Sequence, residues 1–367
     1  MRIVIAPDKF AGTLTAVEAA EAVAEGWHST APGAGCELVP LSDGGPGFVG
    51  VLHSALGGAL VDAQVTGPLG DPVEARYLLV DDTAYVESAL ACGLDQISPQ
   101  QRDPGVTSTR GVGELLAHAI DRGATTVVVG LGGSGTNDGG AGLLAALGAE
   151  PAAALSGGGA ALVDLQGEVD LAPARARTRG VRLIAATDVD NPLLGISGAS
   201  AIFGPQKGAD PDQVQRLDAA LTTFAAKTDP EGDLHSTPGA GAAGGLGYAL
   251  LLLGGRVESG VERVLAAVGL DALVADADLV VTGEGSFDSQ SLRGKLPQGV
   301  ATTAARHGVP CVVLAGRIAV GRAEAAAAGI TETYSLVESA GSVEAALSRS
   351  AEELRRLAGQ VAKRWDR

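Results

Sequence analysis

The feature that most constrains this chain is a glycine-rich stretch, TTVVVGLGGSGTNDGGAG, at residues 125–142. It begins with an unbroken run of β-branched residues at 125–129, which is typical of a strand buried on both faces of a sheet. Seven of the thirteen residues at 130–142 are glycine, and an apolar helix is predicted at 141–147. A strand, a glycine turn and a helix N-terminus in this order form the usual geometry for holding an anion. We therefore expect this loop to approach a ligand closely.

Composition limits the classes of partner. The 367 residues carry a formal charge of −17, and no basic face is visible, which argues against nucleic-acid binding. An anionic substrate would therefore need locally placed cations, backbone amides or a metal. The three cysteines are widely spaced and lack metal-ligand spacing, as expected for a reduced cytoplasmic protein. No signal peptide and no apolar run of about 18 residues is present, so no membrane association is expected.

The order of predicted elements indicates an α/β protein. Alternating strands and helices occur at both ends of the chain, whereas closely spaced strands that favour antiparallel pairing lie between them. We predict a doubly wound parallel-sheet domain from residues 1–60 plus 266–367, an inserted mixed α/β domain at 61–265, and an active-site cleft between them. A mobile loop is predicted at 152–161. The predicted strands of the outer domain are 2–6, 37–41, 279–282, 311–314 and 333–336, and its last helix is 343–364.

Residues 130–135 match the dinucleotide pattern G-x-G-x-x-G. However, no acidic residue ends a second strand about 20 residues later, and residues 239–244 match the same pattern with no strand ahead of them. Phosphate or anion binding is therefore favoured over dinucleotide binding, with purely structural glycines as the alternative. No P-loop motif is present.

Carboxylates gather at predicted strand ends. Asp8, Asp43, Asp188 and Glu284 lie at or just past the C-terminal ends of strands, which is the ligand-binding edge of open α/β sheets, and Asp138 lies beyond the glycine loop. Any one of them alone would be ordinary capping or turn chemistry. Together they suggest a carboxylate-lined cleft that binds Mg²⁺ or acts as a general base. Cations in loops or at helix starts could cover a phosphate, although a solvated surface role is equally open for each: Lys9, Arg110, Lys207 and Lys295.

Nine segments in order resemble the type-1 glycerate kinase family over essentially the full chain. They are IAPDKFAGTLTA (5–16), SDGG (42–45), VTGPLGDPV (65–73), RDPGVTSTRGVGEL (102–115), GLGGSGTNDGGAG (130–142), DVDNPLLG (188–195), GASAIFGPQKGA (198–209), PGAGAAGGLGYAL (238–250) and GEGSFDSQSLRGK (283–295).

This resemblance implies ATP- and Mg²⁺-dependent phosphorylation of D-glycerate, usually at the 2-hydroxyl, by a flavodoxin-like domain of both termini that carries an inserted domain. The positions that match the family motifs are Asp8, Asp43, Asn137, Asp138, Asp188, Asn191, Lys207, Glu284, Asp288 and Lys295. Two positions depart from them: Ala11 replaces a usual lysine, and Pro46 replaces the glutamate of SDGGEG.

Site roles follow as hypotheses from the residues and the resemblance together. The expected catalytic residues are Asp188, Asp43 and Lys207, and the expected substrate-binding residues are Asp8, Lys9, Arg110, Asn137 and Asp138. The nucleotide phosphates are expected at Gly132, Gly133, Ser134, Gly135, Gly241, Gly244, Gly245 and Lys295, and the metal at Asp188, Glu284 and Asp288.

Three other functions remain open at this stage. They are a kinase of this fold for another small hydroxy acid, a non-catalytic sensor of glycerate or a sugar acid, and a dinucleotide-dependent oxidoreductase. Small-molecule ligands are expected as partners, and the protein is expected to be a monomer or a homodimer.

Overall fold

The structure is a computed structural model that describes residues 1–10, 12–292 and 295–365. The chain separates into two compact units. We call Met1–Asp43, Gly50–Leu56 and Val261–Arg367 the terminal unit, and Gly44–Val49 with Gly57–Gly260 the inserted unit. Ala11, one of the two departures from the family motifs, lies outside the described residues.

The terminal unit is built on a parallel five-stranded sheet. Its strand order is β11-β10-β9-β1-β2, and every pairing is parallel. Numbered along this unit, the order is 2-1-3-4-5, that of flavodoxin-like sheets, so the predicted α/β class is confirmed. The strands are β1 (Arg2–Pro7), β2 (Gly35–Leu38), β9 (Leu279–Phe287), β10 (Cys311–Ile318) and β11 (Glu332–Ser335).

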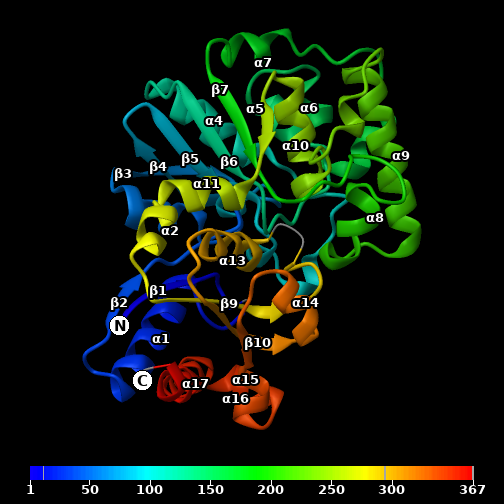
Figure 1. Ribbon diagram of the computed structural model, residues 1–367. Coiled ribbons are helices and arrows are strands. Elements are labelled where there is room, and N and C mark those ends of the chain that lie inside the picture. The colour runs from blue at the N-terminus through cyan, green and yellow to red at the C-terminus, as the bar shows by residue number, and fades with distance from the viewer. Residues whose placement is uncertain (11, 293–294, 366–367) are drawn as a thin grey trace. The chain divides into compact units, whose positions relative to one another are not determined.

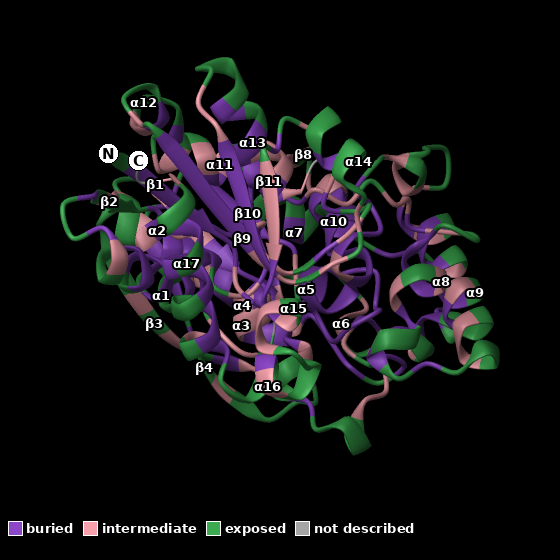
Figure 2. Ribbon diagram, turned by 60° about the horizontal axis from the view of Figure 1, so that its bottom comes forward, coloured by how far each residue is buried: buried purple, intermediate pink, exposed green. Residues whose placement is uncertain are grey.

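Helices cover both faces of this sheet. Figure 1 shows α13 on one side and the pair α1 and α17 on the other. Gly26 allows α1 and α17 to touch, because a Cβ there would lie 2.0 Å from the carbonyl oxygen of Arg355. Figure 2 shows β9 and β10 buried along most of their length, as expected for central strands covered on both faces. The helices that lie wholly in this unit are α1 (Ala16–Thr30), α12 (Leu270–Ala275), α13 (Leu296–Arg306), α14 (Arg322–Ala327), α15 (Leu336–Ala340), α16 (Val343–Ser348) and α17 (Ser350–Trp365).

The inserted unit contains a mixed six-stranded sheet of order β3-β4-β5-β6-β7-β8. The β3–β4 and β4–β5 pairs are antiparallel, and the remaining pairs are parallel. The strands are β3 (Ala59–Thr66), β4 (Pro72–Val80), β5 (Thr83–Glu87), β6 (Thr126–Gly130), β7 (Arg182–Ala186) and β8 (Arg256–Glu258).

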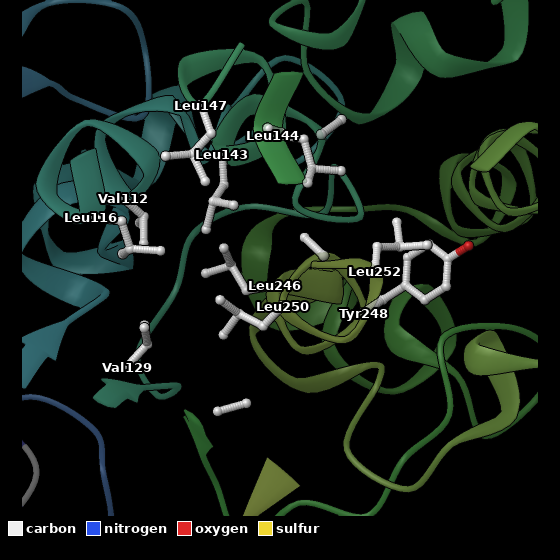
Figure 3. Close-up of a cluster of buried hydrophobic side chains, with 14 of the residues drawn as sticks. Val112, Leu116, Val129, Leu143, Leu144, Leu147, Leu246, Tyr248, Leu250 and Leu252 are labelled. Carbon is white, nitrogen blue, oxygen red and sulfur yellow. The ribbon is translucent and has the colours of Figure 1, made fainter. Parts of the chain in front are cut away.

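Aliphatic side chains fill the core of the inserted unit. Figure 3 shows Val112 and Leu116 of α4, Val129 of β6, and leucines of α5 and α10 around a common centre. All five residues of β6 are buried, as the β-branched run predicts. The helices of this unit are α3 (Ala89–Cys92), α4 (Arg110–Asp121), α5 (Ala141–Ala146), α6 (Ala152–Leu155), α7 (Ala172–Arg177), α8 (Ala199–Phe203), α9 (Pro211–Thr228) and α10 (Ala242–Leu252). The chain passes between the two units after Asp43, within and at the end of α2 (Phe48–Leu56), and after the first residue of α11 (Gly260–Ala267).

Two local predictions are wrong. The segment 152–161 contains α6 and part of a 3-10 helix, η3 (Gly159–Asp164), in place of a mobile loop, because Leu155 and Leu162 are fully buried in the core. The predicted final helix at 343–364 is two helices, since Arg349 leaves helical geometry at φ −133° and ψ 38°. Among the described residues, no helix has both the length and the apolar character needed to span a membrane.

Candidate active site

A cavity of about 510 Å³ opens at the carboxyl ends of β1, β9 and β10 in the terminal unit. This is the edge at which flavodoxin-like sheets bind ligands. The sheet register explains why residues distant in sequence meet there, because Asp8 follows β1 and its amide donates to Gly283 of the adjacent β9 at 2.8 Å. Six of the predicted site residues line this cavity: Asp8, Lys9, Asp43, Glu284, Asp288 and Lys295.

Asp8, Lys9 and Asp43 form a charged group at the cavity. The chain beyond β2 continues along β1, with Leu41 donating to the carbonyl of Pro7, and this brings Asp43 past the same sheet edge. Lys9 Nζ lies 3.4 Å from Asp43 Oδ1 and 3.8 Å from Asp8 Oδ1. Burial, with the neighbouring carboxylate of Asp43, raises the pKa of Asp8 to about 7, and Lys9 offsets part of that shift. Asp8 can therefore exchange a proton near neutral pH.

Glu284 brings a second carboxyl of the same kind. The sequence predicted it just past a strand, but β9 runs on to Phe287 and Glu284 lies within it. Burial raises its pKa to about 7, and its Oε1 atom is buried without a hydrogen-bond partner among the described residues. Native proteins seldom leave a buried carboxylate oxygen unpaired, so this oxygen is suited to a ligand cation or proton.

Acidic side chains in this cavity meet the requirements of Mg²⁺ only in part. In the part of the chain that the structure describes, no three His, Cys, Asp or Glu side chains are grouped closely enough to hold a metal alone. Mg²⁺ in phosphoryl-transfer sites is usually bound through one or two carboxylates plus substrate phosphates, and it keeps several waters. The unpaired oxygen of Glu284 fits that mode of binding. Asp288 lines the same cavity, whereas Asp188 belongs to the inserted unit.

The glycine loop of the inserted unit is packed tightly against its own unit. A Cβ at Gly132 would lie 2.5 Å from Gly45 Cα, and one at Gly133 would lie 2.7 Å from the ring of Pro46. Gly133 also has a φ of +71°, which only glycine adopts readily. Pro46, the second departure from the family motifs, thus packs directly on this loop. Close packing accounts for these glycines whether or not a ligand is bound.

The second glycine stretch, at 239–247, packs onto the first. A Cβ at Gly244 would lie 2.0 Å from the carbonyl oxygen of Thr136, and Gly139 donates its amide to the carbonyl of Gly244 at 2.9 Å. Two of the predicted phosphate-binding amides are already used, since Gly135 donates to Cys92 O at 2.8 Å and Gly241 donates to Asn191 O at 2.9 Å. We therefore do not assign those two amides to phosphate.

The amides of Gly132, Gly133 and Ser134 remain available for an anion. Gly133 is exposed and Gly132 is half-buried, and the described part of the chain offers these three amides no acceptor. Consecutive free amides in a glycine turn are suited to an anion. This portion of the predicted phosphate site is consistent with the geometry.

The carboxylate of Asp138 forms hydrogen bonds within the protein that stabilise the glycine loop. It is fully buried, and its carboxylate accepts hydrogen bonds from the amide and hydroxyl of Thr109 at 2.9 and 2.8 Å and from the amides of Gly140 and Gly142 at 3.0 and 3.2 Å. Burial raises the pKa of this carboxyl, and these donors act in the opposite direction. Because all four donors belong to the protein, we assign Asp138 to the internal structure of the loop rather than to substrate.

Lys207 also acts from inside the protein. It ends a 3-10 helix, η4 (Pro205–Lys207), and is 2% exposed, with its Nζ donating to Ser134 Oγ at 3.0 Å and to the carbonyl of Thr136 at 2.6 Å. Burial lowers its pKa to about 8. Asn137 is fully buried beside this group, and its Oδ1 has no partner among the described residues. The two hydrogen bonds of Lys207 therefore hold Ser134 and Thr136 of the glycine loop in place.

Two further predicted residues lie elsewhere in the inserted unit. Arg110 begins α4 and is engaged with Glu114 at 3.0 Å and with Ser156 Oγ at 3.2 Å. Asp188 follows β7, is half-buried, and accepts a hydrogen bond from Ser259 at 2.5 Å. The structure thus gives Asp188 a fixed orientation and gives Arg110 an ordinary ion pair on its own helix.

Sequence reasoning missed several residues. Arg317 lines the terminal-unit cavity because β10 runs to Ile318, beyond the predicted end at 314. Glu87 is buried in the inserted unit, where it accepts hydrogen bonds from the amides of Gly47 and Val49 at 3.2 Å each. Ser259 was not singled out either. A continued β pattern after residue 314 was the only sequence signal for Arg317. The partners of Glu87 are 38 and 40 residues away in sequence, and Asp188 is 71 residues from Ser259.

Similar proteins identify the family of this chain. Residues 3–366 match the model of the glycerate kinase family. The chain is 43% identical to a glycerate kinase of Bacillus subtilis (strain 168) and 40% identical to a glycerate 2-kinase of Escherichia coli (strain K12), in each case over 99% of this chain and 97% of the relative. A crystal structure from Salmonella typhimurium LT2, of a protein assigned as glycerate kinase 2, aligns with a TM-score of 0.80 at 40% identity over 100% of this chain and 98% of that one. This chain therefore belongs to the glycerate kinase family.

Proposed function

We propose that this protein transfers the terminal phosphoryl group of ATP to the 2-hydroxyl of D-glycerate in a Mg²⁺-dependent reaction. Family membership supports the reaction type, and the E. coli relative is named for the 2-position. The structural observation that carries the proposal is the group of Asp8, Lys9, Asp43 and Glu284 at one cavity on the ligand-binding edge of a flavodoxin-like sheet. Such a group can bind a small hydroxy acid and accept the proton of its hydroxyl group.

Phosphoryl transfer depends mainly on positioning and on charge stabilisation. Mg²⁺ would be held by Glu284, with Asp288 and Asp188 as further candidates, and would neutralise charge that develops on the phosphate oxygens. Lys295, the N-cap residue of α13, and the amides of Gly132, Gly133 and Ser134 would bind phosphate oxygens. Gly244 and Gly245 shape the backbone next to that loop.

Proton transfer from the substrate hydroxyl requires a base. Asp43 and Asp188 are the proposed candidates, because each is a half-buried carboxylate that lies past the carboxyl end of a strand. Lys9 would neutralise the carboxylate of glycerate, since its ammonium group lies 3.4 Å from Asp43 and 3.8 Å from Asp8 in the cavity. Lys207 contributes by holding Ser134 and Thr136 in place.

The decisive experiment is identification of the product after incubation with D-glycerate and Mg-ATP. Phosphorus NMR distinguishes 2-phosphoglycerate from 3-phosphoglycerate, and parallel reactions with other short hydroxy acids test substrate identity. The proposal predicts 2-phosphoglycerate as the main product and a kcat/KM for D-glycerate at least tenfold above that for the other acids. Formation of the 3-isomer would refute the position, and ligand binding without ADP release would indicate a sensor.

A further inference from the structure

Two chemically different sets of residues line the cavity of the terminal unit. One set is the charged residues described above. The other set is apolar, and it includes two large side chains at the surface, because Val343 is 55% exposed and Leu347 is 58% exposed. The apolar residues are Phe10, Leu336, Val337, Val343, Ala346 and Leu347.

The spacing of residues on α16 (Val343–Ser348) explains how its apolar residues come to line the cavity together. Val343, Ala346 and Leu347 are spaced three and four residues apart on α16, so they lie on one face of the helix. Ala346 is 4% exposed and anchors that face, whereas Val343 and Leu347 flank it and remain open. Exposed apolar side chains that share a cavity with polar groups are typical of a ligand site.

Two glycines of paired strands belong to the cavity lining. Gly316 of β10 lines the cavity together with Gly285 of β9, and a Cβ at Gly316 would lie 2.3 Å from the carbonyl oxygen of Gly285. The strand pairing therefore excludes a side chain at Gly316. Backbone without side chains lets a planar group approach closely.

Of the two substrates of the proposed reaction, only the nucleotide has enough apolar surface to contact these apolar residues. D-Glycerate has three carbons, all carrying oxygen, and presents almost no apolar surface. A cavity of about 510 Å³ is also in the range that holds drug-sized ligands, well beyond so small an acid. A purine base, in contrast, is planar and presents two broad faces that gain from contact with aliphatic side chains.

We propose that Val343, Leu347 and Val337 form the subsite for the purine base of the nucleotide, with its phosphates directed toward Lys295 and Arg317, two cations of the same cavity lining. This inference rests on the proposed function for the identity of the nucleotide. It places base recognition in the terminal unit, on residues that carry none of the predicted site roles.

The test shortens the two exposed apolar side chains of the cavity lining without adding charge. In the double variant Val343→Ala with Leu347→Ala, both positions are exposed and alanine favours helix, so the fold is expected to persist. The matched control is Val17→Ala, an apolar residue of α1 that is 40% exposed and outside the cavity. Calorimetric titration with the non-hydrolysable analogue AMPPNP measures nucleotide binding without turnover. Inorganic tripolyphosphate, which lacks a base, is titrated in parallel.

The proposal predicts that AMPPNP binds the double variant about tenfold more weakly than wild type, while tripolyphosphate affinity changes by less than twofold. The control should match wild type for both ligands. The KM for D-glycerate should stay within twofold, whereas the KM for ATP rises. A single Leu347→Gln variant, which keeps side-chain length, should show a smaller loss for AMPPNP alone.

Three outcomes would overturn the subsite: unchanged AMPPNP binding, equal weakening of AMPPNP and tripolyphosphate, or a rise confined to the KM for glycerate. Failure of the proposed function is recognised separately. If wild type binds AMPPNP with the predicted pattern but forms no phosphoglycerate, the subsite stands and the glycerate kinase reaction falls.

Discussion

The ammonium nitrogen of Lys207 donates a hydrogen bond of 2.6 Å to the carbonyl oxygen of Thr136. The two residues are 71 positions apart, and the same nitrogen also holds the hydroxyl of Ser134 at 3.0 Å. A buried lysine is costly unless its protons are used, and these contacts use them to hold Ser134 and Thr136 of the glycine loop in place. Lys207 thus acts on the glycine loop of 130–142 through its hydrogen bond with Ser134.

Replacing Lys207 by methionine should therefore loosen this loop. The carbonyl of Thr136 would lose its donor, which costs about 1–3 kcal/mol of stability, and phosphate affinity should fall more than glycerate affinity. Because the pKa of Lys207 is lowered from 10.5 to about 8, the unfolded chain binds more protons between those values. Wild type should consequently gain stability relative to the variant as pH rises from 8 to 10.5.

Urea unfolding at pH 7.5 and 9.5 with tripolyphosphate titration checks this prediction. Lys227→Met is the matched control, since Lys227 donates to the carbonyl of Gly167 at the surface. Equal stability and equal phosphate binding in the Lys207 variant would remove the lysine from any supporting role.

Asp8 should make the protein less stable at alkaline pH. Its pKa is raised from 3.8 to about 7, so the folded state binds more protons than the unfolded state in that window, and the stability contributed by this group is lost as pH rises toward 7. Asp8→Asn should raise stability by about 1–3 kcal/mol at pH 8 and by much less at pH 4.5, while abolishing most activity. Thermal unfolding at both pH values measures this, with the exposed turn residue Asp71→Asn as control. A pH-independent difference would contradict the raised pKa.

Asp138→Ala should destabilise the inserted unit strongly. The change leaves buried donors at Thr109, Gly140 and Gly142 without an acceptor, which predicts a loss of about 2–4 kcal/mol. Denaturant unfolding of the variant beside Asp212→Ala, an exposed position in the first turn of α9, provides the measurement. If Asp138→Ala instead keeps full stability and loses only glycerate affinity, the carboxylate belongs to the substrate site after all.

Glu284→Gln should alter the dependence of activity on Mg²⁺. A neutral amide in place of the unpaired Oε1 weakens cation binding, so half-maximal activity should need at least tenfold more Mg²⁺. EDTA should abolish activity of both proteins, and added Mg²⁺ should restore it. Glu352→Gln, on the exposed side of α17, should titrate like wild type. An unchanged Mg²⁺ titration in Glu284→Gln would exclude it as a ligand.

Asp188→Asn should lower kcat by about two orders of magnitude or more if Asp188 is the base or a metal ligand, with little change in stability, because asparagine still accepts the hydrogen bond of Ser259. Steady-state kinetics against Asp190→Asn, an exposed neighbour in the same loop, isolates the effect. Near-normal kcat in Asp188→Asn would leave Asp43 as the proposed base, and the equivalent variant at that position would then show the loss.

The buried strands could be predicted from local composition. The run at 125–129 is buried and β-branched, and short apolar runs near both termini became strands of one parallel sheet. Strand ends were less predictable, since β9 and β10 continue past glycines at 283 and 316 that look like turn residues in sequence. Pairing with neighbouring strands holds those residues extended, and that contribution to the energy does not appear in the local sequence.

The sequence by itself determined the family, the α/β class and the set of polar residues at the strand ends, because these depend on residue type, periodicity and motif order. Only the tertiary structure decided how the glycine loop of 130–142 is packed and which of its groups form hydrogen bonds within the unit. A Cβ at Gly130 or Gly132 would lie 2.5 Å from backbone atoms of Gly44 or Gly45, and Asp138 and Lys207 form hydrogen bonds within the unit. The amides of Gly132, Gly133 and Ser134 have no acceptor among the described residues. Burial and the reach of hydrogen bonds across distant segments set these roles, and both exist only after the chain has folded.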